Sequence, residues 1–153
     1  MGRTDRASLL VHVDSARVFE ALTQREALQR WLPPAGMHGR FEEFDMREGG
    51  SYRLVLTYED ASDAPGKTSA DSDVSTTRIV EIVPGERVVH EIDFESDDAA
   101  FHGTMQMEWS LHPVEEGTIV EVVARNVPSG IRARDHAAGL TSSLANLSAL
   151  VGP

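Results

Sequence analysis

Arg78 and His90 are the two side chains in this sequence whose types could combine in one chemical site. A three-residue loop at residues 84–86 would pair Val80 with His90 and Arg78 with Ile92. Arg78 and His90 would then be diagonal neighbours on one dry face, roughly 7 Å apart at Cα. Such a pair could anchor a carboxylate or an enolate, or could serve as a general base with a cationic partner. The structural alternative is that Arg78 extends to the sheet edge and His90 binds a backbone carbonyl.

The segment "TMQMEWSLHP", residues 104–113, alternates large soft side chains with polar ones. This alternation predicts a strand with one wet and one dry face. The dry face could pack in a filled core, where Met commonly fills irregular gaps, or could line a pocket. The presence of polar tips on the same interior favours a pocket, because each would cost about 1–3 kcal/mol if left unpaired. We therefore predict one ligand-binding cavity lined by Tyr58, Arg78, His90, Met105, Met107 and Trp109, closed by the last helix.

Other candidates for chemistry are weaker. Asp135 and His136 open the last helix, where the helix macrodipole alone favours an acidic side chain, and no nucleophile accompanies His136. The six histidines have no metal-binding spacing, so we predict no metal site, and no phosphate-binding glycine motif is present. No cofactor and no catalytic set are predicted.

The elements that must position these residues follow from periodicity. Residues 8–13 read as a strand, followed by a helix that Asp14 or Ser15 caps and a second short helix that begins with a capping box at Thr23. Six strands with period two follow, with a turn at Gly49–Gly50 that requires positive φ and a polar loop at residues 61–73. The final segment predicts a helix of about five turns. Its apolar stripe is Ala133, Ala137, Leu140, Leu144, Leu147 and Val151.

This order predicts an α+β fold in which a curved antiparallel β-sheet wraps around one long C-terminal helix, since a sheet with one dry face must be covered. The 153 residues suit a single domain, residues 1–153. The polar loop at residues 61–73 and the acidic residues at 95–98 are expected to be solvated surface or to flank the mouth of a pocket.

Several segments resemble the helix-grip (SRPBCC) superfamily of START and Bet v 1-like domains, and within it the group related to the C-terminal domain of the Hsp90 ATPase activator. They are "VFEAL", "RWLPPAGM", "FDMREGGSYR", "RIVEIVPGERVVHEI", "GTIVEVVARNVP" and "DHAAGLTSSLANLSAL". The resemblance spans nearly the whole chain and implies a helix-grip fold. Many members have a Trp shortly after the Gly of the last helix, but here Leu140 follows Gly139. A role for that Trp is therefore not carried over.

Composition limits the partners. The net charge is −11, with no basic stripe, so we predict no nucleic-acid partner and no binding to anionic membranes. The first residues contain no apolar region of a signal peptide, and no apolar run reaches transmembrane length. The absence of cysteine fits a reducing cytoplasm, where we expect the protein to be located as a monomer or a homodimer.

Three functions remain open from the sequence. The first is a binder of a small apolar or amphipathic molecule, with an acidic head group near Arg78. The second is an enzyme of the cyclase or hydratase type that uses the same cavity, as in some members of the superfamily. The third is an Hsp90-type co-chaperone or another protein-interaction module. The residues favour the binder because they contain no coherent set of acid, base and nucleophile.

Overall fold

The computed structural model describes residues 2–59 and 72–152. The polar loop expected at 61–73 therefore lies mostly outside the described residues, and residues 72 and 73 already belong to a strand. In chain order the elements are β1 (Arg3–Val11), α1 (Ser15–Thr23), α2 (Arg25–Trp31), β2 (Met37–Glu42), β3 (Ser51–Tyr58), β4 (Ser72–Val83), β5 (Arg87–Phe94), the 3₁₀ helix η2 (Ala99–Phe101), β6 (Met105–Val114), β7 (Gly117–Val127) and α3 (Ala133–Val151). Apart from η2, this is the predicted order.

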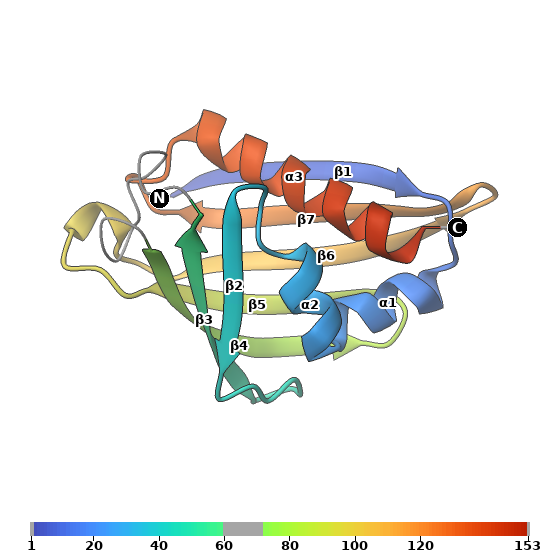
Figure 1. The fold of residues 1–153 in the computed structure, drawn as a ribbon, viewed down its shortest axis with the longest axis horizontal. Helices are drawn as coiled ribbons and strands as arrows, with labels where there is room; N and C mark the ends of the chain where they lie inside the picture. The colour runs from blue at the N-terminus through green and yellow to red at the C-terminus, as the bar shows by residue number, and fades with distance from the viewer. Residues whose placement is uncertain (1, 60–71, 153) are drawn as a thin grey trace.

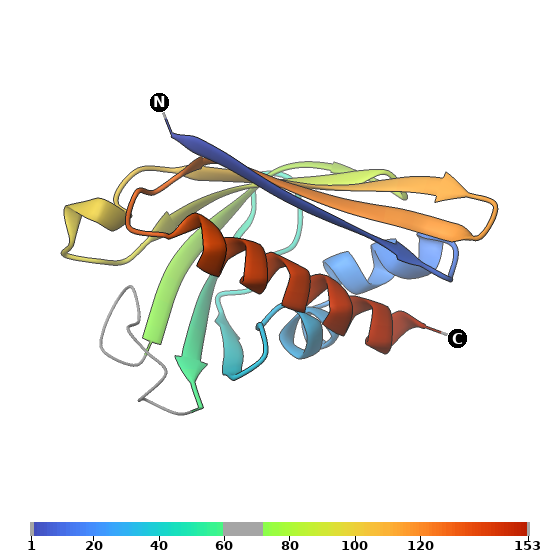
Figure 2. The same ribbon diagram turned by 90° about the horizontal axis from the view of Figure 1, so that it is seen from above.

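Within the described residues, seven strands form one antiparallel sheet in the order β1-β7-β6-β5-β4-β3-β2 (Figure 1). The sheet is curved, and α3 runs along its concave side with α1 and α2 beside the C-terminal half of α3 (Figure 2). The predicted α+β helix-grip fold is confirmed. No helix in the described part of the chain is long and apolar enough to cross a membrane.

The two short helices differ in how they begin. Asp14 caps α1 as predicted, since its Oδ1 accepts a hydrogen bond from the backbone N–H of Arg17 at 3.0 Å. The predicted capping box of α2 is wrong. The hydroxyl of Thr23 donates to the carbonyl of Phe19 at 3.0 Å, within α1, and Gln24 precedes α2 without a side-chain cap bond. Helix α2 nevertheless forms, because its apolar face is buried.

Helix α3 covers the sheet with the predicted residues from Leu140 onward, all of which are buried. Ala133 and Ala137 are exposed, so this part of the predicted stripe is wrong. In the first turns of α3, His136 and Gly139 line the cavity beneath the helix instead. A side-chain hydrogen bond holds α3 to the segment after α2, because the hydroxyl of Ser143 donates to the carbonyl of Leu32 at 2.7 Å.

A β-bulge at Val80 decides which side chains of β4 face inward. The expected three-residue loop is confirmed by the pairing of Ile82 with Val88, but the register shifts between Ile79 and Glu81. Ile79, not Val80, therefore lies opposite His90, and Val80 is 47% exposed. A bulge adds one residue to one strand and reverses the faces beyond it.

The turn between β2 and β3 lies against this bulge. The N–H of Gly49 donates to the carbonyl of Ile79 at 3.0 Å, and the N–H of Ile79 donates to the carbonyl of Gly50 at 2.9 Å. Gly49 has a φ of 83°, as predicted for this turn, which a residue with a Cβ rarely adopts. These bonds fix the backbone of β4 immediately before the bulge.

Arg78 lies on the outer face as a consequence, so its predicted position on the dry face beside His90 is wrong. It pairs with Glu91 in the sheet. Its Nη1 donates to Oδ2 of Asp93 at 2.6 Å, and its Nε lies 3.7 Å from Oε1 of Glu91. The Arg78 side chain is 42% exposed. The hydrogen bond with Asp93 is the main cause that raises the pKa of Arg78, and Glu91 raises it further.

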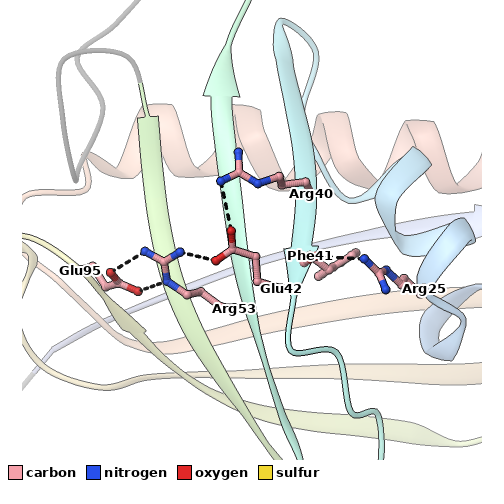
Figure 3. Close-up of polar contacts among 6 residues, drawn as sticks. All are labelled: Arg25, Arg40, Phe41, Glu42, Arg53 and Glu95. Atoms are coloured by element: carbon pink, nitrogen blue, oxygen red, sulfur yellow. Dashed lines mark hydrogen bonds and ion pairs between the residues drawn. The ribbon is translucent and has the colours of Figure 1, made fainter.

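The outer face carries a second charged network around Arg53 (Figure 3). Its guanidinium donates to both carboxylate oxygens of Glu95, at 2.7 and 2.9 Å, and also to Glu42. Arg40 donates to the same carboxylate of Glu42 at 3.1 Å. Arginine side chains of this sheet thus bind acidic neighbours on the outer face, while the inner face of the same strands is mostly apolar.

Candidate functional site

A cavity of about 250 Å³ lies between the concave face of the sheet and the helices. Five of the six predicted residues line it, and Arg78 does not. The five are Tyr58, His90, Met105, Met107 and Trp109. The remaining wall is largely apolar and includes side chains from α1, α2 and α3. Ligand sites are commonly apolar cavities with a few fixed polar groups, and this cavity has that character.

Strands β5 and β6 supply the floor of the cavity. Their inward-facing residues lie directly opposite one another, so the alternation seen in the sequence becomes a continuous surface. The pairs are Val88 with Trp109, His90 with Met107, and Ile92 with Met105.

His90 is the polar group set deepest in this floor. The residue is only 5% exposed, and its Nε2 has no hydrogen-bond partner in the described part of the protein. Burial lowers the pKa of His90 to about 4, because the surrounding apolar wall disfavours the charged ring. The imidazole is therefore neutral at pH 7, with one ring nitrogen as donor and the other as acceptor.

Tyr52 stands beside His90 in an edge-to-face contact, with the ring centroids 6.3 Å apart. Burial raises the pKa of Tyr52 to about 12, and a hydrogen bond with the side chain of Thr77 offsets part of this effect. The phenol is therefore protonated at physiological pH. Unlike His90, Tyr52 has its polar tip satisfied within the sheet.

Trp31 of α2 also lines the cavity, a role that sequence reasoning missed. The helical periodicity placed it on a buried face of α2 but gave no indication of what that face meets. Its ring lies 5.1 Å from that of Trp109 at an interplanar angle of 80°. Its Nε1–H donates to the carbonyl of Ala21 at 2.8 Å, which fixes the ring against α1.

The more exposed lining residues include Tyr58 and Asp135, and the carboxylates of Asp73 and Asp135 both lie close enough to Tyr58 to affect its hydroxyl. Burial raises the pKa of Tyr58, and the charges of Asp73 and then Asp135 raise it further. Asp73 itself is only 4% exposed. This side of the cavity therefore carries two carboxylates, which the sequence did not indicate because residues 58, 73 and 135 are far apart along the chain.

His136 also lines the cavity and is oriented by Asp5 from β1. Its Nδ1 lies 2.8 Å from Oδ2 of Asp5, and both side chains are largely buried, at 14% and 11% exposure. Arg3 donates to both oxygens of Asp5, at 2.8 and 2.9 Å, and to the carbonyl of Ile131 at 2.6 Å. The hydrogen bond from Arg3 is the main cause that lowers the pKa of Asp5, and the bond with His136 adds to it.

No group of three or more acidic or histidine side chains that could hold a metal ion occurs among the described residues. The chemistry that the cavity offers is therefore apolar contact together with hydrogen bonding, through one buried neutral imidazole, one oriented imidazole and carboxylates at one side.

Comparisons with known proteins agree with this architecture. The family described as "Activator of Hsp90 ATPase homolog 1-like protein" matches residues 12–152. The crystal structure of protein CV1439 from Chromobacterium violaceum is 31% identical with a TM-score of 0.85, covering 98% of this chain and 97% of that one. No curated protein matches the sequence.

Two further structures share the fold at lower identity. A protein from Rhodobacter sphaeroides is 20% identical with a TM-score of 0.77, covering 98% of this chain and 93% of that one. A solution structure of a protein from Arthrobacter aurescens is 15% identical with a TM-score of 0.76, covering 97% and 85%. The family match includes every element that lines the cavity, and among the helices and strands only β1 lies outside it. The chain therefore belongs to the family of activator of Hsp90 ATPase homolog 1-like proteins.

Proposed function

We propose that this protein binds a small apolar or amphipathic molecule in the cavity beneath α3. The observation that carries the proposal is a space of about 250 Å³ bounded mostly by apolar side chains, among which His90 has a buried Nε2 without a partner in the described part of the chain. A filled core would not leave such a volume, since protein interiors pack as closely as organic crystals. The fold family supports binding of this kind.

The size of the cavity limits the ligand. An apolar cavity of about 150 Å³ in a protein accommodates benzene, so the present volume suits a molecule of one or two rings. If such a ligand buries about 200 Å² of apolar surface, transfer from water contributes about 5 kcal/mol. Ordering costs reduce this value, so micromolar to millimolar dissociation constants are expected.

Equilibrium dialysis with 2-methylnaphthalene tests the proposal directly. The wild type should bind one equivalent in that range. A Met107→Trp variant, which adds bulk to the cavity floor, should bind at least tenfold more weakly. The exposed Val114, at the end of β6, offers a matched control, because Val114→Trp adds the same side chain outside the cavity. Equal binding by the wild type and the Met107→Trp variant would place the ligand elsewhere and contradict the proposal.

A second candidate function, an enzyme of the cyclase or hydratase type, is favoured by one specific observation. His136 faces the cavity while Asp5 accepts or shares the proton at its Nδ1. A carboxylate that orients an imidazole in this way is an arrangement through which histidine can act as a general base or acid. Turnover of a bound ligand that is lost in His136→Gln, with unchanged ligand affinity, would support this function over simple binding.

A further inference from the structure

We infer that the ligand of this cavity is an uncharged, mostly apolar molecule whose single hydroxyl group pairs with the imidazole of His90. The inference rests on the proposed binding function and names the chemical class of the ligand. It excludes the carboxylic acids expected from the sequence, because the residue that was to bind them, Arg78, lies on the outer face. Three independent features of the described cavity lead to this class.

The first feature is the unsatisfied polar group. His90 is only 5% exposed, and its Nε2 has no hydrogen-bond partner in the described part of the chain. Native proteins leave few buried polar atoms unpaired, and those that remain often mark a place where a bound group completes the bond. The neighbouring Tyr52 does not complete it, because its ring contacts the imidazole edge to face, with centroids 6.3 Å apart, and Nε2 has no hydrogen bond to it.

The second feature is that the neutral ring of His90 can be matched best by a group that both donates and accepts hydrogen bonds. A neutral imidazole presents one donor and one acceptor nitrogen, and rotation about χ2 exchanges the edges of the ring. A hydroxyl can donate or accept, so it matches either tautomer and either edge. A carbonyl can only accept, and a hydrocarbon leaves the ring unpaired. A hydroxyl on an apolar skeleton can therefore form a hydrogen bond with His90 while the skeleton contacts the apolar side chains of the cavity.

The third feature is the sign of the charge. Among the described lining residues there is no Lys or Arg, whereas Asp73 and Asp135 contribute carboxylates. Arg78, which follows the lining residue Thr77 in sequence, donates to Asp93 on the other side of the sheet. An anionic head group would lose its hydration and would find no cationic Lys or Arg side chain among the described lining residues, which is unfavourable.

Dialysis of one matched series tests the inference. The probes share one ring system and differ in one substituent: 2-methylnaphthalene, 2-naphthol, 2-naphthoate and 2-naphthylmethylamine. For the wild type at pH 7.5 we expect 2-naphthoate to bind at least tenfold more weakly than 2-naphthol. The amine should also bind more weakly than 2-naphthol, because its charge must be desolvated beside a neutral ring.

Variants of His90 separate hydrogen bonding from apolar contact. In His90→Leu the affinity for 2-naphthol relative to 2-methylnaphthalene should fall by about tenfold, the usual effect of removing one partner of a buried hydrogen bond. His90→Gln, which restores a donor and an acceptor, should recover part of this preference. Val80→Leu, which introduces the same side chain at a 47% exposed position of β4 outside the cavity, is the matched control and should leave the preference unchanged.

The outcomes distinguish the two proposals. If 2-methylnaphthalene binds but the preference for 2-naphthol is the same in wild type and His90→Leu, the hydroxyl inference fails and the binding function stands. Tighter binding of the acid or the amine than of 2-naphthol also overturns the inference. If none of the four probes binds, the proposed function fails and the inference fails with it.

Discussion

Trp31 and Trp109, which both line the cavity, contact each other edge to face, with their ring centroids 5.1 Å apart and their planes at 80°. Trp31 comes from α2 and Trp109 from β6, so this contact joins the short helices to the sheet beneath them. The geometry is one that aromatic quadrupoles prefer.

The pair should be energetically coupled. In a double-mutant cycle of Trp31→Leu and Trp109→Leu, we expect a coupling free energy of about 0.5–1.5 kcal/mol, in the range of aromatic pairs. Urea unfolding of the four proteins measures it. A parallel cycle that combines Trp31→Leu with Val114→Ala, an exposed position at the end of β6, should be additive. Additivity in the tryptophan cycle as well would show that the ring contact contributes nothing specific.

His90 should make the protein less stable as the pH falls. Its pKa is about 4 when folded and about 6.5 when unfolded, so below pH 6.5 the unfolded chain binds a proton that the folded protein does not. The free energy of unfolding should therefore decrease by about 2 kcal/mol between pH 7.5 and pH 5 from this residue alone. Below pH 4 both states are protonated and this decrease ends.

The variant His90→Leu isolates that contribution. It removes the titrating ring and an unpaired buried polar atom, so the variant should be at least as stable as the wild type at pH 7.5. Its stability should change less between pH 7.5 and pH 5. Urea denaturation at these two pH values provides the comparison. Parallel pH dependence in both proteins would mean that His90 is not held in a low-pKa environment.

The fold and most of the cavity wall could be predicted because they depend on local periodicity. Alternation places Met105, Met107 and Trp109 on one face, and strand β6 is regular over that stretch, so the prediction is confirmed. The same logic fails for Arg78 because a bulge intervenes in β4. The bulge is fixed by backbone bonds from Gly49 and Gly50, some thirty residues earlier in the chain, which no local pattern of β4 contains.

The charged part of the cavity could not be predicted for a related reason. Asp5 and His136 are 131 residues apart in sequence and meet only because α3 folds back along the first strand. Each has an ordinary local explanation, as an alternating polar residue of a strand and as a residue of the first helical turn. Only the tertiary structure gives the two residues a joint role beside the cavity.

Arg78→Ala should leave ligand affinity unchanged, in contrast to the expectation from the sequence alone. The guanidinium lies outside the sheet in a half-exposed pair with Asp93, so its loss should cost at most about 1 kcal/mol of stability. Met105→Ala, inside the cavity, should cost about 2–5 kcal/mol because Met105 is 3% exposed. Dialysis with 2-naphthol and urea unfolding test the two variants together. Weaker ligand binding by Arg78→Ala would show that the outer face influences the site.

Asp5→Asn should loosen the start of α3. The change weakens the ion pair with Arg3 and the contact with His136, both partly buried, and should cost about 1–3 kcal/mol. Glu20→Gln, which weakens an exposed pair with Arg17 at 3.7 Å, is the control and should cost less than about 0.5 kcal/mol. Hydrogen exchange of the first turns of α3 should increase in Asp5→Asn only. Equal protection in both variants would show that this network does not hold the helix.

Gly139 offers a way to alter the cavity while keeping the helix. It lies within α3, lines the cavity and has an ordinary helical φ, and a Cβ there would meet only Cγ of Pro34, at 3.9 Å. Gly139→Ala should therefore stabilise the protein by up to about 1 kcal/mol, because alanine favours the helix more than glycine does.

Gly139→Phe should place a ring in the cavity and reduce the affinity for 2-naphthol by tenfold or more, with little loss of stability because the ring occupies existing space. Thermal unfolding and dialysis of the same three proteins measure both effects. If Gly139→Phe binds 2-naphthol as the wild type does, the ligand does not occupy the space beneath this turn of α3, and the proposed site would have to be abandoned.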